Sequence, residues 1–371
     1  MTLRTLAVVG TGLIGTSVAL AASRRGVTVH LLDRDESAAR TAAALGAGLP
    51  GSPPHPVDLA VIAVPPSAAA PVLAEAQARR LALSYTDVAS VKAPAQREIL
   101  AGVPDPRRYI GGHPLAGRER SGPLAARADL FRGRAWVLTP TRLTSKTAFD
   151  RALDLIALCD AEPRVMRARA HDDAVALTSH APHLVASLMA ARLSEGPPEA
   201  PHLAGQGLRD VTRIARGDSR LWSDIIESNA GAVADILTRL QEDLGAVLAA
   251  LKDLAEPDLI RGPEAMAKSR NILVDLLERG ITGVEELDAG PGRRETVAPG
   301  RDMAPAGLDE GTGGGDMAPA GLDEGTGGGD MAPAGLDEGT EGPDTGPGGQ
   351  ARATARPGTR PGRCAPREPA R

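Results

Sequence analysis

The chain has 371 residues, a formal net charge of −5 and only six aromatic side chains: two Trp, two Tyr and two Phe. It is long enough for two folded domains and a further segment. The weak acidic charge would not attract nucleic acid or an acidic membrane, and six rings are too few for a base-stacking surface. We therefore expect no nucleic acid and no membrane as partners, and a core of Ala, Leu, Val and Ile.

The first 166 residues alternate short β-branched runs with helix-length segments rich in Ala and Leu. This order is typical of strands joined by crossover helices in a parallel sheet. It predicts an α/β domain over residues 1–166. The strands are expected at 5–9, 27–32, 59–64, 84–87, 108–110, 135–138 and 163–165.

A glycine-rich loop, Gly10-Thr11-Gly12-Leu13-Ile14-Gly15, follows the first predicted strand and opens a helix. Gly10 allows a tight turn, Gly12 leaves room for a pyrophosphate, and Gly15 lets helix and strand pack closely. The helix N-terminus adds free N–H groups. Asp33 ends the second strand, where an acid binds a ribose hydroxyl pair. This context favours a Rossmann-type dinucleotide-binding domain over a glycine turn without a ligand.

The residues around this loop also bear on the choice of cofactor. The Asp33 carboxylate would repel a 2′-phosphate and so favours NAD, whereas Arg34 beside it could attract that phosphate and allow NADP. Val64 and Pro65 leave the third main strand at the edge of the sheet where a cofactor lies. A plain strand end with two prolines explains them equally well. We predict NAD as the cofactor.

Strand signals stop near residue 166, and Gly and Pro breaks divide residues 170–278 into helical segments. This pattern predicts an all-helical domain over residues 167–288. Apolar residues three, four or seven positions apart form one seam along a long helix in it. The periodicity alone does not distinguish packing within the chain from a dimer contact. The seam comprises Ile226, Val233, Leu237, Leu240, Leu244, Val247 and Leu251.

Residues 289–371 change character again. A fourteen-residue unit starts at Asp302 and repeats from Asp316 and, truncated, from Asp330. Each copy has only one Leu and one Met to bury, which predicts a disordered low-complexity tail and not a solenoid. We interpret its arginine-rich end as solvated; a nucleic-acid-binding arm is the alternative, and the missing aromatic residues speak against it.

The two cysteines, Cys159 and Cys364, form neither a metal-ligand spacing nor a disulfide framework. A reducing compartment fits this usage. No apolar leader precedes a cleavage site, and we expect no segment long and apolar enough to cross a bilayer. These observations predict a cytoplasmic protein.

Four strings with polar residues follow the glycine loop. They are Asp87-Val88-Ala89-Ser90-Val91-Lys92, Gly111-Gly112-His113-Pro114-Leu115-Ala116-Gly117, Ser179-His180-Ala181-Pro182-His183 and Arg209-Asp210-Val211-Thr212-Arg213-Ile214-Ala215. In this combination and order they closely resemble the prephenate/arogenate dehydrogenases of tyrosine biosynthesis, over about residues 3–251. The resemblance implies NAD-dependent oxidative decarboxylation of prephenate to 4-hydroxyphenylpyruvate, and a homodimer formed by the helical domain.

The resemblance also assigns the catalytic residues. His113 matches the base that accepts the substrate's hydroxyl proton, and imidazole titrates near neutral pH as such a base must. Ser90 matches the serine that hydrogen-bonds this imidazole and the substrate hydroxyl. A structural role for His113, and an N-cap role for Ser90 in a helix near Ala93, are the alternatives.

Arg213 matches the arginine that holds the ring carboxylate, a task suited to a planar fork of donors. An ion pair with Asp210 is its alternative. His180 and His183 are spaced like zinc ligands, but a third ligand with suitable spacing is absent and we predict no metal. The remaining matches are His183 and Ser179 at the substrate's side-chain end, Glu119 at the pocket entrance, Trp222 near the site, and Asp172 near the partner subunit's pocket. Core packing is the alternative for Trp222. A solvated charge in a loop is the alternative for Glu119.

Three other functions stay open at this point. Arogenate and an amino-substituted prephenate are alternative substrates, and no residue in the sequence distinguishes them from prephenate. A β-hydroxyacid dehydrogenase usually relies on a lysine in its helical domain, where this chain has only Lys252 and Lys268, both late. A catalytically inactive nucleotide-binding protein would not need Ser90, His113 and Arg213. Some members of the resembled family end in a regulatory domain, and this chain has its low-complexity tail at that place. We therefore do not expect control by tyrosine through such a domain.

Overall fold

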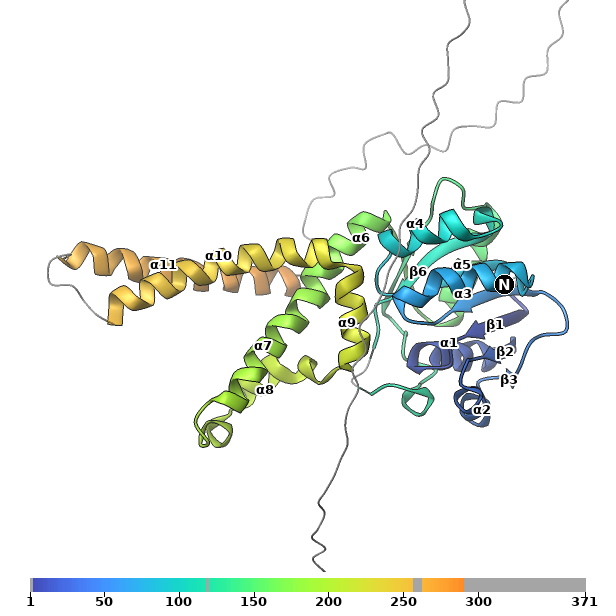
Figure 1. The fold of residues 1–371 in the computed structure, drawn as a ribbon, viewed down its shortest axis with the longest axis horizontal. Helices are drawn as coiled ribbons and strands as arrows, with labels where there is room; N and C mark the ends of the chain where they lie inside the picture. The colour runs from blue at the N-terminus through green and yellow to red at the C-terminus, as the bar shows by residue number, and fades with distance from the viewer. Residues whose placement is uncertain (1–2, 118–119, 256–261, 290–371) are drawn as a thin grey trace, which may run out of the picture. The chain divides into compact units, whose positions relative to one another are not determined.

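A sheet of eight strands forms the N-terminal part of the protein, with helices on both of its faces (Figure 1). The computed structural model describes residues 3–117, 120–255 and 262–289. The strand order is β3-β2-β1-β4-β5-β6-β7-β8. The strands are β1 (Thr5–Val9), β2 (Thr28–Leu32), β3 (Leu49–Pro50), β4 (Val57–Ile62), β5 (Ala82–Asp87), β6 (Tyr109–Pro114), β7 (Ala135–Thr139) and β8 (Glu162–Val165).

The carboxyl ends of the central strands meet at one edge of this sheet. Neighbouring strands from β3 to β6 are parallel, and β7 is antiparallel to β6. Strand β1 lies between β2 and β4, so that Val9 pairs with both Leu32 and Ile62. The strand order therefore reverses between β1 and β4. In open parallel sheets, ligands bind in the crevice outside such a reversal.

Two hydrophobic layers cover the faces of the sheet. In β4, Leu59 and Val61 belong to one layer, whereas Ala60 and Ile62 belong to the other. Helices α1, α2 and α5 cover the first layer, and α3 and α4 the second. Burial on both faces explains why the strands are apolar without alternation. These helices are α1 (Leu13–Ser23), α2 (Glu36–Ala44), α3 (Pro66–Ala78), α4 (Ala93–Gly102) and α5 (Lys146–Leu158).

The predicted α/β domain is confirmed, with two main differences among its strands and shifts of about two residues at the ends of β4 and β5. Strand β3 was not predicted, because it is only two residues long and includes Pro50. Strand β6 was predicted to end at residue 110, with His113 in a loop, and this boundary is wrong. The strand continues to Pro114 because it pairs there with β7, His113 opposite Val137. Two adjacent glycines weaken the strand signal at this point.

Helices follow the sheet, as predicted. The small apolar cluster among them consists of Ala176, Ala232 and Val233, with Leu184 and Leu237 packed against it. One turn between α6 and α7 is π-helical, a feature that frequently marks functional sites. The elements are α6 (Ala168–Val175), the π-helical turn (Ala176–His180), α7 (Ala181–Glu195), α8 (Gln206–Thr212), a 3₁₀ turn (Arg213–Arg216), α9 (Ser219–Ser228), α10 (Ala230–Ala255) and α11 (Gly262–Asp288).

The predicted apolar seam is divided between two helices. Helix α9 ends before Asn229, so Ile226 does not belong to the long helix α10. The first turns of α10 are buried at Val233, but Leu240 and Leu244 are 43% and 66% exposed. Helices α10 and α11 lie side by side (Figure 1). The seam therefore packs within the chain near its start and leaves an apolar face further along.

The helical stretch Ala168–Glu195 has 28 residues, and its most apolar window has a mean hydropathy of 1.2. By length and composition it could cross a bilayer, so the expectation that no segment could do so is wrong. Its apolar character comes from Ala and Leu. The same stretch carries the buried polar side chains of His171, Asp172 and His180, whose partners lie elsewhere in this fold.

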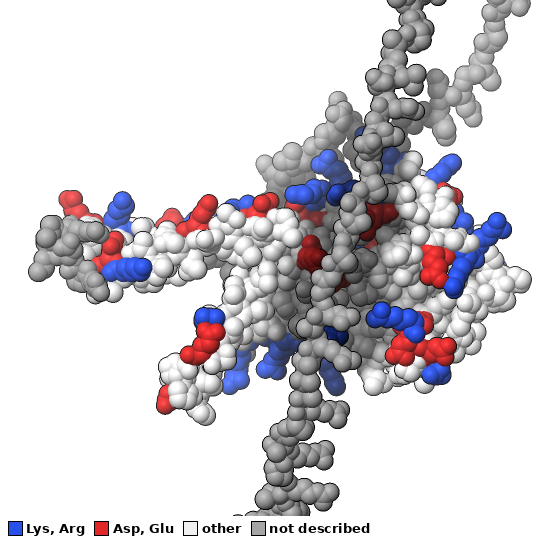
Figure 2. Space-filling model, viewed as in Figure 1, with Lys and Arg blue, Asp and Glu red and all other residues white. Residues whose placement is uncertain are grey.

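Charged side chains of both signs are intermixed on the face of the molecule seen in Figure 2. Cys159 is buried as a free thiol, and burial raises its pKa to about 12, so it is inert at neutral pH. Cys364 and the predicted tail beyond Ala289 lie outside the described residues, as does Glu119.

Candidate active site

The glycine loop joins β1 to α1 at the reversal of the strand order. Gly10 has a φ of +100°, and a Cβ there would lie 2.2 Å from the carbonyl oxygen of Ala63. A Cβ on Gly15 would lie 1.9 Å from the carbonyl oxygen of Gly10. A Cβ on Gly12 would meet no atom within 4 Å. Gly10 and Gly15 are therefore required by packing, whereas Gly12 leaves open space over the start of α1.

A cavity of about 1260 Å³ opens beside this loop. It exceeds the volume of about 300–1,000 Å³ that is usual for small-molecule sites, as an extended dinucleotide requires. Helix α9 contributes Asp224 to its wall. Of the predicted cofactor residues, Gly10, Gly12, Asp33, Arg34, Val64 and Pro65 line it. Leu13 begins α1 and Ile14 packs against the hydrophobic core instead.

Asp33 ties this loop to the end of β2. Its Oδ2 accepts hydrogen bonds from the backbone N–H of Thr11 (2.6 Å) and the Thr11 hydroxyl (2.9 Å). Its Oδ1 accepts one from the backbone N–H of Asp35 (2.9 Å). A carboxylate has about four acceptor positions, so one position remains for a further donor. A dinucleotide fits this arrangement. The space above Gly12 is open, the cavity is large enough, and an acid stands at the end of β2.

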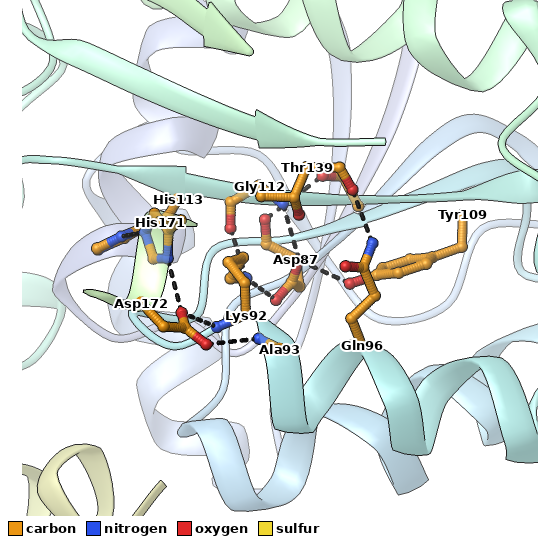
Figure 3. Close-up of polar contacts among 11 residues, drawn as sticks. Asp87, Lys92, Ala93, Gln96, Tyr109, Gly112, His113, Thr139, His171 and Asp172 are labelled. Carbon is orange, nitrogen blue, oxygen red and sulfur yellow. Dashed lines mark hydrogen bonds and ion pairs between the residues drawn. The ribbon is translucent and has the colours of Figure 1, made fainter. Parts of the chain in front are cut away.

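A second group of polar residues lies at the end of β6. His113 is partly exposed, and its Nδ1 lies 2.8 Å from Nε2 of His171 in α6. His171 is 1% exposed, and its Nδ1 lies 2.8 Å from Oδ1 of Asp172. The Asp172 carboxylate also accepts hydrogen bonds from the backbone N–H groups of Lys92 (2.8 Å) and Ala93 (2.7 Å). A continuous chain of polar contacts therefore links His113 to the start of α4 (Figure 3).

A buried ion pair holds the backbone just before His113. Lys92 Nζ pairs with Asp87 Oδ2 and donates a hydrogen bond to the carbonyl oxygen of Gly112 (2.8 Å). Asp87 Oδ1 accepts from the N–H of Gly112 (2.9 Å) and from the Tyr109 hydroxyl (3.2 Å). Both side chains of the pair are at most 1% exposed (Figure 3). Each partner would be costly to bury alone, so the pair fixes Gly112 and with it the position of His113.

The surroundings of His113 disfavour its charged form. Burial, followed by the positive charge that His171, Lys92 and His180 would place nearby, holds the pKa of His113 well below its ordinary value of 6.5. Burial also lowers the pKa of His180 to about 4. Both imidazoles are therefore neutral at physiological pH, and a neutral imidazole is the form that can accept a proton.

A third group lies on α7 and α9. The rings of His183 and Trp222 stack with centroids 3.6 Å apart and an angle of 13° between their planes. Gly217 packs beneath this pair, since a Cβ there would lie 2.2 Å from the indole nitrogen of Trp222. His183 is 5% exposed, and its Nδ1 has no hydrogen-bond partner among the described residues. It is thus a buried polar atom that a bound molecule could satisfy.

Family models match most of the folded chain. Residues 18–165 match the model described as "Prephenate dehydrogenase, nucleotide-binding domain", and residues 167–264 match "Prephenate dehydrogenase, dimerization domain". The probable prephenate dehydrogenase NovF of Streptomyces niveus is 42% identical over 292 residues, 78% of each chain. The chain belongs to the prephenate dehydrogenase family. The resemblance read from the sequence is confirmed.

Other members of the prephenate dehydrogenase family differ in their named substrates. The prephenate dehydrogenase of Bacillus subtilis is 30% identical over 62% of this chain and 66% of its own length. The cyclohexadienyl dehydrogenase of Zymomonas mobilis is 33% identical over 64% of this chain and 85% of its own. Crystallised prephenate dehydrogenase from A. aeolicus shares the fold, with a TM-score of 0.63 and 23% identity over 75% of this chain and 99% of its own.

The structure adds contacts for two of the residues predicted from the prephenate dehydrogenase resemblance. The Asp172 carboxylate is buried against α4 and His171 of the same chain, and its place near the partner subunit's pocket stays a prediction. The alternative prediction for Ser90, an N-cap of the helix near Ala93, is wrong. Helix α4 begins after Lys92, and Asp172 accepts the N–H of its first residue. The Ser90 hydroxyl, partly exposed after β5, bonds to no other described residue.

The other predicted substrate residues lie in the helical part. Ser179 is in the π-helical turn, and Arg213 is exposed at the start of the 3₁₀ turn that packs against α7. The structure therefore brings the turn of Arg213 to the helix that carries His183. Glu119 lies outside the described residues.

Sequence reasoning missed four residues of this site. No role was assigned to His171, Asn229 or the Asp87–Lys92 pair. Asn229 Nδ2 donates to the carbonyl oxygen of Asp172 (2.9 Å) and lies 3.1 Å from Nδ1 of His180. The available signal was Lys92 in the largely apolar residues 88–94, whereas His171 lies among charged residues and gave no such signal. Among the described residues no group suited to a metal ion occurs.

Proposed function

We propose that this protein oxidises prephenate with NAD⁺ to 4-hydroxyphenylpyruvate, carbon dioxide and NADH. The observation that carries the proposal is His113, a neutral imidazole at the carboxyl edge of the sheet whose Nδ1 is already bonded to His171. Its Nε2 is left to act as a base. A positioned base of this kind contributes about 10²–10⁴-fold to a rate.

The proposed reaction balances with one base and one hydride acceptor. Bound NAD⁺ supplies the acceptor for the hydride that leaves the hydroxyl-bearing ring carbon. His113 takes the hydroxyl proton at Nε2, while the carbon–oxygen double bond forms. The C–C bond to the ring carboxylate then breaks, carbon dioxide leaves, and its electron pair makes the ring aromatic. The proton held on His113 returns to the product's oxygen.

The cofactor proposal is based on the loop between β1 and α1. Gly10, Gly12, Val64 and Pro65 line the cavity, and Asp33 stands where a ribose would end. The Asp33 carboxylate disfavours a 2′-phosphate, and Arg34 is exposed beside it. We therefore propose NAD rather than NADP. The A. aeolicus protein of the same fold was crystallised with NAD⁺ and hydroxyphenyl propionate.

The substrate proposal places the two carboxylates of prephenate among residues of the helical part. Arg213 is proposed to hold the ring carboxylate, and His183 with Ser179 the side-chain end. Trp222 supports His183 through their stacked rings. Ser90 is proposed to bond the substrate hydroxyl next to His113, since its own hydroxyl is otherwise unengaged by the described residues. Glu119 remains a candidate for the pocket entrance.

Arogenate is the second candidate substrate. A Synechocystis arogenate dehydrogenase has the same fold, with a TM-score of 0.57 and 25% identity over 72% of this chain and 99% of its own. Prephenate is favoured because the 42% identical relative is named for it. We further propose a cytoplasmic homodimer, with the apolar face of α10 and α11 as its contact. The exposed residues of that face include Leu244, Leu248, Leu277, Ile281 and Leu287.

Steady-state rates with purified protein test this proposal. Prephenate and arogenate are each offered with NAD⁺ and with NADP⁺, and reduced cofactor is followed by absorbance. We expect the highest kcat/KM with prephenate and NAD⁺. A higher kcat/KM with arogenate would transfer the substrate assignment to it. Absence of reduced cofactor with all four pairs would contradict the proposed function.

A further inference from the structure

We propose that His171 and Asp172 are positioning residues that hold the proton of His113 on Nδ1 and so keep its Nε2 free as the base. The inference deepens the proposed function, since it explains how His113 is kept in the reactive tautomer. It adds a role for the helical part of the chain, because His171 and Asp172 belong to α6 whereas His113 belongs to β6.

The direction of the hydrogen bonds follows from Asp172. Its two oxygens accept from the backbone N–H groups of Lys92 and Ala93, at 2.8 and 2.7 Å, and its side chain is 3% exposed. Backbone N–H groups can only donate, so the carboxylate accepts in these contacts. It therefore acts as the fixed acceptor at the end of the chain of contacts.

The tautomer of each imidazole follows when His171 carries a single proton. His171 must donate from Nδ1 to Asp172, because the carboxylate carries no proton to give. A neutral imidazole has one N–H, so Nε2 of His171 is an acceptor. His113 must accordingly donate from Nδ1 across the 2.8 Å contact. The lone pair of His113 is left on Nε2, the nitrogen not engaged by His171.

The charges around His113 show why such a partner is needed. Lys92, at the start of α4, and His180, in the π-helical turn, both disfavour a positive charge on His113. Asp172 is the nearby negative charge on α6, and it reaches His113 only through His171. When His113 takes up a proton, the acceptor at His171 stays in place and Asp172 balances the new charge. This is the arrangement of a base with an orienting acid, with one imidazole inserted between them.

His180 doesn't compete for this role. Its Nδ1 lies 3.1 Å from the amide nitrogen of Asn229, which is a donor. Burial lowers the pKa of His180 to about 4, so the ring is neutral and receives that bond. The same amide donates to the carbonyl oxygen of Asp172. Asn229 thus braces the residue that orients His171.

Nitrogen NMR of histidine-labelled protein without substrate tests the inference. The chain has 7 histidines, and the His113 signals are assigned by their loss in His113→Gln. At neutral pH we expect His113 to carry its proton on Nδ1 in the wild-type protein. A wild-type spectrum with the proton on Nε2 would overturn the inference, whatever any variant does.

Two substitutions of His171 separate positioning from packing. His171→Phe keeps a ring but removes the acceptor, and we expect mixed tautomers at His113 and a kcat lower by about 10–100-fold, with little change in KM for prephenate. His171→Gln places an amide oxygen near the former Nε2 and should restore the Nδ1–H tautomer and most of kcat. The matched control is Asp173→Asn, on the next residue, which is exposed and pairs only with Arg169 in the described chain.

The outcomes also separate this inference from the proposed function. If His171→Phe keeps the wild-type tautomer and kcat, the positioning role is wrong while turnover of prephenate stands. If the tautomer changes as expected but the wild type reduces no NAD⁺ with prephenate, the positioning role stands and the proposed function fails.

Discussion

At the scale of single residues, the proposed base His113 would accept a proton in surroundings that resist positive charge. Burial and Lys92 keep it neutral and therefore ready as a base, while Asp172 lies close enough, through His171, to balance the proton once it arrives. The Asp87–Lys92 pair holds both the N–H and the carbonyl oxygen of Gly112, the residue before His113. Position and protonation state are thus set by different neighbours.

The lowered pKa of His113 predicts the acid side of the pH profile. The residue is catalytically competent only when neutral, so activity is retained as pH falls below 6.5 and is lost when pH passes through the lowered pKa. We expect the acid limb of kcat/KM for prephenate to lie below pH 6.5. An acid limb at or above that value would contradict the description of His113 as a residue whose surroundings disfavour its charged form.

Sequence patterns revealed His113, Ser90 and Arg213 through local strings, but they did not reveal His171. The reason is that its proposed role depends on the contact with His113, which lies 58 residues earlier in the sequence. The contacts of Asp172 with the start of α4 were missed for the same reason, because Lys92 and Ala93 lie 80 and 79 residues earlier. Contacts between remote segments leave no periodic signal in a sequence.

At the scale of elements, the carboxyl edge of the sheet collects the ends of β1, β5 and β6, and α6 closes against α4 there. The strand predictions identified this edge because apolar runs and glycine breaks are local signals. They ended β6 too early because its last residues are held by pairing with β7, which only the fold supplies. The break between α9 and α10 at Asn229 was missed because apolar spacing continues across it.

The glycine loop yields a matched pair of variants. Gly12→Val adds a side chain where no atom lies within 4 Å, so we expect normal folding and NAD⁺ binding weakened by at least about 10-fold, since the space meant for the pyrophosphate is filled. Gly10→Ala meets a carbonyl oxygen at 2.2 Å with φ at +100°, so we expect lost stability instead. Calorimetric titration and thermal unfolding measure the two effects. Tight NAD⁺ binding by Gly12→Val would contradict the assigned cofactor path.

The cap on α4 predicts a stability difference between neighbouring acids. Asp172→Asn removes charge from a buried carboxylate that receives two backbone N–H groups, and we expect the free energy of unfolding to fall by about 2 kcal/mol. Asp173→Asn alters only an exposed ion pair and should change it by less than about 0.5 kcal/mol. Urea denaturation of both variants provides the comparison. Equal losses would show that Asp172 does not cap the helix.

At the scale of the whole molecule, the proposed active site draws on both parts of the chain. In this proposal the α/β part provides the glycine loop, Ser90 and His113, and the helical part provides His171, Asp172, His183 and Trp222. The order of the two parts was predictable from the change in periodicity near residue 166. The apolar seam along α10 was also predictable, but whether it packs inside the chain was not, because periodicity does not name a partner. Its exposed half supports the proposed dimer.

The buried neutral histidines predict how stability depends on pH. Burial lowers the pKa values of His113, His180 and His183, so below pH 6.5 the unfolded chain binds protons that the folded chain refuses, and stability falls. For His180, with a pKa of about 4, the loss between pH 6.5 and 4 is about 1–3 kcal/mol. Urea unfolding across this range should show a weaker pH dependence in His180→Gln than in the wild type. The exposed control His202→Gln should follow the wild type, and an unchanged slope in His180→Gln would refute the assignment.

The central claim is that His113 is the base for oxidation of prephenate by bound NAD⁺. Its most direct test is the rate of NADH formation in a single turnover, with prephenate and NAD⁺ both saturating, for the wild type and for His113→Gln. We expect this rate to fall by about 10²–10⁴-fold in the variant while the Kd for NAD⁺ stays the same. NADH formation at the wild-type rate in His113→Gln would contradict the claim.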